Sequence, residues 1–175
     1  MNQKINLKKM VLTALFTALT CVATILIKIE MPATHGYLNI GDCFVLLGAW
    51  VLGPIYGAFA GGVGSALADA LGGYMHYVPG TLVIKALMAV IAALLFRVLS
   101  KKNTYLGQLI GGIAAELWMV LGYFIYAYLI LGKGESAALS IPGNLLQGAV
   151  GIVAAIALVV ALRESKTLDK VNSNG

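Results

Sequence analysis

Charged residues are scarce in this sequence. The 175 residues include 12 Lys or Arg and 7 Asp or Glu, or 11% of the chain, whereas about a quarter of a water-soluble domain is charged. Hydrophobic residues make up 60%. This composition excludes a soluble domain and indicates an integral membrane protein. Because each span takes roughly 20 residues, the chain has space for at most about seven spans and for no soluble catalytic or nucleotide-binding domain.

Residues suited to catalysis, metal binding or nucleotide binding are also scarce. Cys21 and Cys43 stand in apolar runs without a CxxC spacing, and neither histidine has a partner at a metal-ligand spacing. The segment 61–65, GGVGS, is not a phosphate loop because no lysine follows it. The sequence contains no GxSxG or HExxH motif. We therefore expect no enzymatic activity, no metal site and no cofactor.

Apolar runs fill most of the chain and predict six transmembrane helices in a single membrane domain, 1–175. Gly53-Pro54 divides the second helix from the third, because proline cannot continue a helix. The expected fold is an all-α integral membrane protein with a flexible polar tail at 164–175. The predicted spans are 10–27, 41–52, 56–71, 82–96, 106–131 and 141–162.

The basic residues are distributed unevenly between the two sides of such a bundle. Nine fall on the side that holds both termini, whereas only Lys28 and Lys133 fall in loops on the other side. Because basic loops stay in the cytoplasm, both termini are predicted to be cytoplasmic. The net charge of +5 thus reflects topology, and no nucleic-acid partner is expected. The nine residues are Lys4, Lys8, Lys9, Arg97, Lys101, Lys102, Arg163, Lys166 and Lys170.

Four ionisable residues lie in or at the ends of the predicted spans: Asp42, Asp69, Lys85 and Glu116. A charge that faces lipid is costly, so each is expected to face protein or water. All three acids are candidate partners for Lys85. Glu116 lies about 15 Å into the fifth span at a rise of 1.5 Å per residue. We interpret it as a structural partner of Lys85, as the floor of a ligand cavity, or as the protonated site of a self-sufficient proton-coupled carrier.

Polar and aromatic side chains near Glu116 are suited to line such a cavity. Met119 and Tyr123 share its helical face. Asn144 and Gln147 share a face of the sixth span, where amides suit a flat heterocycle, although amides also join helices to one another. The predicted substrate-binding residues are Glu116, Asn144, Gln147, Tyr123, Met119, Tyr37, Asn39, Lys85 and Tyr77.

Small residues on the first span form a different kind of surface. Ala14 and Ala18 are four residues apart and therefore lie on one helical face. Small residues at this spacing let another helix approach closely. We expect this pair to dock another membrane protein.

Four segments of the sequence resemble one family of membrane proteins. They are YLNIGD (37–42), LGPIYGA (52–58), GGVGSALAD (61–69) and PGTLVIKA (79–86). They are similar to the substrate-binding S components of energy-coupling factor (ECF) vitamin transporters, most closely to the riboflavin-type group, which includes proteins for vitamin B6 and hydroxymethylpyrimidine. The resemblance implies a six-helix bundle that binds its ligand near the outer face of a bacterial or archaeal cell membrane.

The resemblance also implies partners. S components have no energy source of their own, and they join a membrane coupling protein and two ATPase subunits to form an importer. The pair Ala14 and Ala18 matches the small-residue motif with which the family contacts the coupling protein. A carboxylate, two amides and tyrosines favour a small nitrogen heterocycle, of vitamin B6 or hydroxymethylpyrimidine type. Queuine or another deazapurine, and riboflavin, are the alternative ligands.

Overall fold

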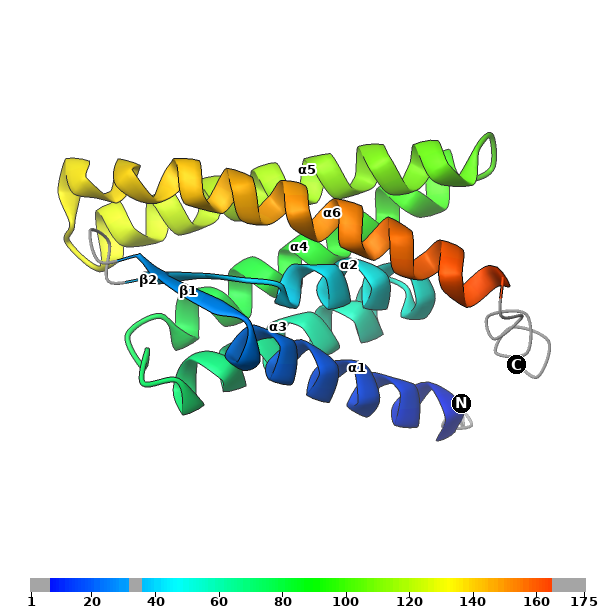
Figure 1. Cartoon of the computed structure of the whole chain (residues 1–175), viewed down its shortest axis with the longest axis horizontal. Coiled ribbons are helices and arrows are strands. Elements are labelled where there is room, and N and C mark those ends of the chain that lie inside the picture. The colour runs from blue at the N-terminus through cyan, green and yellow to red at the C-terminus, as the bar shows by residue number, and fades with distance from the viewer. Residues whose placement is uncertain (1–6, 32–35, 165–175) are drawn as a thin grey trace, which may run out of the picture.

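The computed structural model describes residues 7–31 and 36–164, and this part of the chain forms six α-helices (Figure 1). The expected all-α fold with six helices is confirmed. Lys4, Lys166, Lys170 and the tail from residue 165 onward lie outside the described residues. The helices are α1 (Leu7–Leu26), α2 (Gly41–Leu52), α3 (Pro54–Leu71), α4 (Val78–Leu99), α5 (Thr104–Ile125) and α6 (Ile141–Glu164). A π-helical turn, Tyr126–Ile130, follows α5, and a 3-10 helix, Gly134–Ser140, precedes α6.

Within residues 7–31 and 36–164, four helical stretches are long and apolar enough to cross a membrane, so the chain is a multi-pass membrane protein. Helices α1, α3, α4 and α5 begin two to four residues before the predicted spans. In α3 and α4 the added residues include Pro54 and Pro79, which suit the first turn of a helix. The four stretches are Leu7–Leu26, Val78–Leu99, Thr104–Ile130 and Gly134–Leu162.

A sharp turn separates α2 from α3, as the Gly-Pro pair predicts. Gly53 adopts a φ of 82°, which residues with a side chain rarely adopt. Pro54 then starts α3, where its missing N–H costs no helical hydrogen bond. Helices α2 and α3 therefore pack antiparallel, and Gly53 alone connects them.

The segment that precedes α2 forms a small hairpin, where the sequence predicts only a polar loop. Strand β1 (Lys28–Met31) pairs antiparallel with β2 (Gly36–Asn39), so that Lys28 faces Asn39. Strands of four residues are too short for an alternating pattern to stand out in the sequence. The hairpin carries the chain from the end of α1 back into the bundle, to the point where α2 begins (Figure 1).

Helix α2 is short and occupies the centre of the bundle. Its 12 residues extend about 18 Å, whereas the hydrocarbon core is about 30 Å thick. Val45 and Leu46 are fully enclosed, and α1, α3, α4 and α6 all pack against the helix. Because α2 begins only midway along the bundle (Figure 1), the other helices extend beyond its N-terminal end. A cavity lies at this end of the fold.

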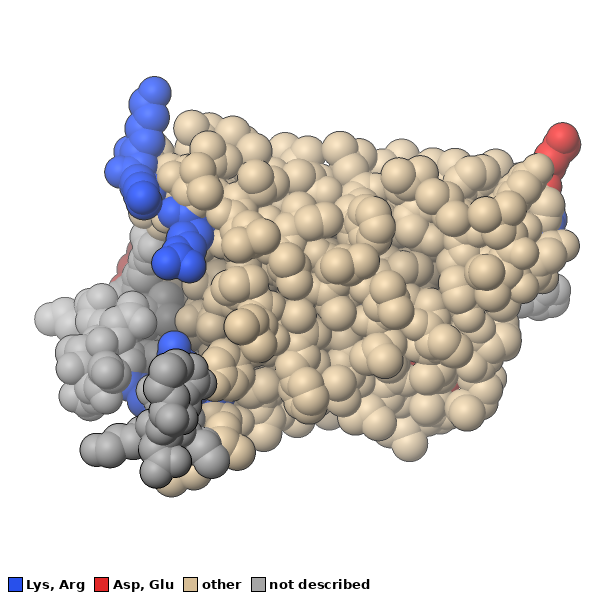
Figure 2. All heavy atoms as spheres, turned by 180° about the vertical axis from the view of Figure 1, so that it is seen from behind, with Lys and Arg blue, Asp and Glu red and all other residues tan. Residues whose placement is uncertain are grey.

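Charged residues are concentrated at the ends of the bundle. Figure 2 shows Lys and Arg gathered at one end, while the wall between the two ends is uncharged on the face in view. Helix α1 begins and α6 ends at the same end of the bundle (Figure 1). An uncharged band between polar ends is the pattern expected of a bundle surrounded by lipid.

Glycines bring α3 close to its neighbours. A Cβ on Gly57 would lie 2.8 Å from Cα of Ala49 in α2, and a Cβ on Gly64 would lie 2.6 Å from the carbonyl oxygen of Thr17 in α1. Such distances are shorter than real contacts. The close packing of α1, α2 and α3 therefore depends on the absence of side chains at these positions.

Candidate functional site

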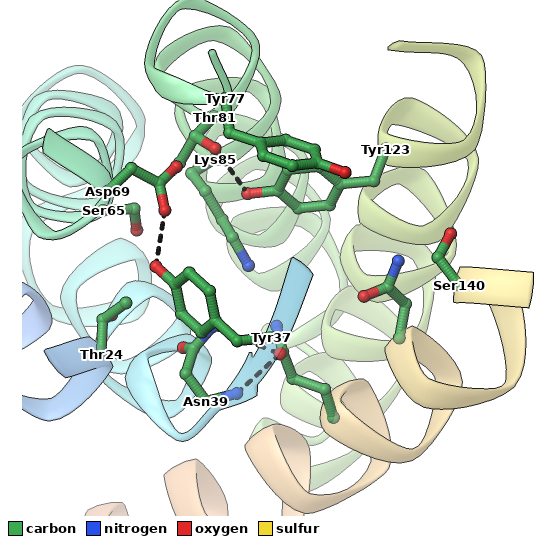
Figure 3. A pocket seen from close by; sticks show the side chains of 12 residues that line it. Thr24, Tyr37, Asn39, Ser65, Asp69, Tyr77, Thr81, Lys85, Tyr123 and Ser140 are labelled. Atoms are coloured by element: carbon green, nitrogen blue, oxygen red, sulfur yellow. Dashed lines mark hydrogen bonds between the residues drawn. The ribbon is translucent and has the colours of Figure 1, made fainter. Parts of the chain in front are cut away.

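A polar cavity lies between the hairpin and the neighbouring ends of α3, α4, α5 and α6 (Figure 3). The empty space within it, together with the open solvent at its mouth, amounts to about 560 Å³. The residues that line it come from every helix except α2. They are Thr24, Tyr37, Asn39, Ser65, Asp69, Tyr77, Thr81, Lys85, Tyr123, Ser140, Asn144 and Gln147.

Hydroxyl groups and one carboxylate form one wall of the cavity. Tyr37 of β2 donates to Oδ1 of Asp69 at 2.5 Å, and Tyr123 of α5 donates to Oγ1 of Thr81 at 3.0 Å (Figure 3). Thr81 and Asp69 both line the cavity. Burial and, secondly, the negative charge of Asp69 raise the pKa of Tyr37, so its hydroxyl keeps the proton that it donates.

Amide groups form the opposite wall. The backbone N–H of Asn39 donates to Oε1 of Gln147 at 2.9 Å, and Nε2 of Gln147 donates to Oδ2 of Asp42 at 2.6 Å. Oδ1 of Asn39 accepts from the backbone N–H of Gly41 at 2.8 Å and so supports the first turn of α2. This chain of bonds fixes the orientation of Gln147 and ties β2 to α6.

Lys85 of α4 carries the positive charge that faces the cavity. It is 2% exposed and pairs with Asp42 at the start of α2, which settles the partner that the sequence left open among three acids. Its ammonium group also lies 5.5 Å from the centre of the Tyr123 ring. An ammonium group has three N–H donors, so Lys85 keeps hydrogen-bonding capacity for a ligand.

Two side chains in the cavity wall have unused hydrogen-bonding capacity. Asn144 is 6% exposed and Ser65 is 3% exposed. Neither side chain forms a hydrogen bond with any of the residues that the structure describes. A buried polar group without a partner is unfavourable, so both are suited to bind a polar ligand.

Aromatic rings surround the outer part of the cavity. The ring of Tyr77 lies 6.3 Å from that of Tyr123 and 6.2 Å from that of Tyr126, and the ring of Tyr37 lies 4.7 Å from that of Tyr74. Lys133 donates to the hydroxyl of Tyr77 at 2.9 Å. These rings offer flat faces on which a heterocycle can stack.

Seven of the nine predicted substrate-binding residues line this one cavity: Tyr37, Asn39, Tyr77, Lys85, Tyr123, Asn144 and Gln147. Glu116 and Met119 do not line it. Glu116 lies beside Asp42 against α6, and Met119 is fully buried in the hydrophobic core. Helical spacing describes one helix at a time, so it cannot show that α2 places Asp42 beside Glu116.

The sequence analysis did not assign several cavity residues: Thr24, Ser65, Asp69, Thr81 and Ser140. A signal for most of them was present. Ser65 and Asp69 are four residues apart on α3, as are Thr81 and Lys85 on α4, so each pair shares a helical face. A polar pair on one face of an otherwise apolar span indicates a polar environment.

The predicted docking residues Ala14 and Ala18 lie on the outward face of α1. Both are exposed, together with Val11, Leu15 and Val22. The described residues contain no group of three His, Cys, Asp or Glu side chains that could hold a metal ion, and His35 lies outside them.

The comparison with known proteins gives one family and two relatives. A sequence model of the family "ECF-type riboflavin transporter, S component" matches residues 4–164. The thiamine precursor transporter HmpT of Lactococcus lactis is 31% identical over 151 residues, which cover 86% of this chain and 84% of HmpT. An uncharacterised protein of Pyrococcus woesei is 42% identical over 133 residues, which cover 75% of this chain and 86% of that protein.

Proposed function

Because the chain belongs to the family of S components of ECF-type riboflavin transporters, we propose that it binds hydroxymethylpyrimidine or a vitamin B6 compound for uptake. The protein is a transport subunit of vitamin-transporter type and not an enzyme. The proposal concerns the ligand, the partners and the orientation in the membrane.

The observation that carries the proposal is a cavity lined by a positive charge, a carboxylate, amides and aromatic rings. An aminopyrimidine has a flat ring, ring nitrogens that accept hydrogen bonds and an amino group that donates them. Lys85 and the Asn144 amide can donate to the ring nitrogens, and the oxygen of the Asn144 amide can accept from the amino group. The similarity to HmpT, a thiamine precursor transporter by name, supports the same ligand class.

The alternative ligands fit this wall less well. A guanine-like edge, as in queuine, requires a carboxylate that is free to accept two hydrogen bonds. Asp69, the carboxylate in the wall, already accepts from Tyr37. Riboflavin carries three fused rings and a ribityl chain, so it needs more room than a single pyrimidine ring.

We propose that uptake requires a membrane coupling protein and two ATPase subunits, with Ala14 and Ala18 at the contact with the coupling protein. Their exposed position on α1 supports this role. The basic residues of the described part support a cytoplasmic location for the end of the bundle where α1 begins and α6 ends, in the cell membrane.

Ligand binding and transport can be tested on the purified protein in lipid nanodiscs and liposomes. Isothermal titration should give tight binding of hydroxymethylpyrimidine or pyridoxine and much weaker binding of queuine and riboflavin. Tight binding of riboflavin alone would overturn the ligand assignment. In liposomes the protein alone should transport nothing; uptake driven by a proton gradient would instead establish a self-sufficient carrier.

A further inference from the structure

Two carboxyl groups lie together below the ligand cavity. Glu116 of α5 is 4% exposed and Asp42 of α2 is 1% exposed. A Cβ on Gly151 of α6 would lie 3.1 Å from Oε1 of Glu116 and 3.0 Å from Cβ of Asp42, and a Cβ on Gly148 would lie 3.1 Å from Oε2. The two glycines thus leave the space that both acids occupy.

The two acids differ in their hydrogen bonds. Asp42 accepts from Lys85 at Oδ1 and from Gln147 at Oδ2. Neither oxygen of Glu116 has a hydrogen-bond partner among the described residues. Glu116 and Asp42 nevertheless lie side by side, since both side chains are about 3 Å from the same Cβ position at Gly151. Because ionised carboxylates only accept hydrogen bonds, a bond between these two groups requires a proton.

The charges around Glu116 do not balance without that proton. The charged groups that interact electrostatically with Glu116 are Asp42 from α2 and Lys85 from α4. Helix α6 places only the uncharged Gly148 and Gly151 against it. Two carboxylates and one ammonium group leave one negative charge inside the bundle, which is costly in such a place. One bound proton makes the group of three neutral and gives Glu116 a hydrogen bond.

We propose that Glu116 and Asp42 form a buried proton-binding site. In this site Glu116 is protonated and donates a hydrogen bond to the carboxylate of Asp42. The effect of this site on ligand affinity rests on the proposed function. When the proton leaves, two carboxylates compete for Lys85 and draw its ammonium group away from the cavity wall. A ligand that accepts a hydrogen bond from Lys85 therefore binds the protonated state more tightly, and its affinity falls as the pH rises and the proton is lost.

Infrared spectroscopy tests the proton directly, without any ligand. Protein in nanodiscs at neutral pH should show the carbonyl stretch of a buried protonated carboxyl group, and this band should disappear at alkaline pH. The band should be missing in Glu116→Gln and present in the matched control Glu135→Gln, since Glu135 is exposed on the 3-10 helix. Absence of the band from the wild-type protein at neutral pH would overturn the proposal, whether or not the variant folds.

The linkage to the ligand is tested by titration with hydroxymethylpyrimidine across pH. Glu116→Gln should match the wild-type affinity at neutral pH, because its amide also donates to Asp42. At alkaline pH the wild type should lose up to about tenfold more affinity per pH unit than the variant, since one proton is linked to binding. Protonation of the pyrimidine itself changes the affinity of the wild type and of the variant equally.

Parallel pH curves for the wild type and Glu116→Gln would overturn the linkage. If hydroxymethylpyrimidine and pyridoxine both fail to bind the wild type, the proposed function fails. The infrared band then decides separately whether the proton-binding site exists.

Discussion

Tyr37 donates a hydrogen bond to Asp69 and thereby joins the hairpin to α3 across one wall of the cavity. The two oxygens lie 2.5 Å apart, although the residues are 32 positions apart in the sequence. The ring of Tyr37 also contacts that of Tyr74, just beyond the end of α3. The position of β2, which supplies both Tyr37 and Asn39 to the cavity, therefore depends on contacts with α3 and the loop that follows it.

Tyr37→Phe should weaken the binding of hydroxymethylpyrimidine by up to about tenfold, or about 1.4 kcal/mol, because loss of the bond to Asp69 leaves β2 and its Asn39 less firmly positioned at the cavity. The phenylalanine keeps the ring contact but leaves Asp69 with one donor fewer. Isothermal titration gives the affinity. Tyr128→Phe is the matched control, since Tyr128 is exposed and does not line the cavity. If Tyr37→Phe binds the ligand as tightly as Tyr128→Phe does, the Tyr37 hydroxyl does not contribute to ligand binding.

Asn144→Ala should reduce affinity more than tenfold while leaving the unfolding temperature nearly unchanged. Its amide forms no hydrogen bond with the described residues, so the ligand-free protein loses little when the amide is removed. A ligand that uses the amide loses its hydrogen bonds, each worth about 1 kcal/mol. Leu145→Ala serves as the control because Leu145 is the next residue and is exposed. Unchanged affinity together with a large drop in unfolding temperature would instead indicate a structural role.

Lys85→Met should destabilise the protein by about 3–5 kcal/mol, because it leaves Asp42 buried without its cation. The double variant Lys85→Met with Asp42→Asn should recover part of this loss, since the uncompensated charge is gone. Thermal unfolding in detergent measures both changes. Lys102→Met, at the exposed turn between α4 and α5, should have little effect. Additive losses in the double variant would show that the two side chains do not interact.

The helices could be predicted from the sequence because long apolar runs have one common explanation in a chain with so little charge. The shared face of Asn144 and Gln147 follows from helical spacing alone, and both residues do line the cavity. Helical spacing, however, describes one helix at a time. It left the partner of Lys85 open, because that partner depends on the contact between α2 and α4.

The depth of α2 could not be predicted for the same reason. Its 12 residues, apolar apart from Asp42, look like a short span, and nothing within them shows that the helix begins midway along the bundle. This depth places Asp42 beside Glu116 and puts the floor of the cavity above Glu116. The hairpin, with four residues in each strand, was also too short to predict.

Ala14→Trp and Ala18→Trp should abolish uptake while changing ligand affinity by less than about twofold, a difference below 0.5 kcal/mol. Both alanines are exposed on α1, and neither lines the cavity, so a large side chain there would separate a docked helix from α1 without reaching the ligand. Uptake is measured in liposomes that contain the coupling protein and both ATPase subunits, and affinity by titration. Val153→Trp is the control, because Val153 is equally lipid-facing on α6 with 70% of its surface exposed. If all three variants transport normally, the coupling protein docks on another face; if Val153→Trp alone fails, that face is on α6.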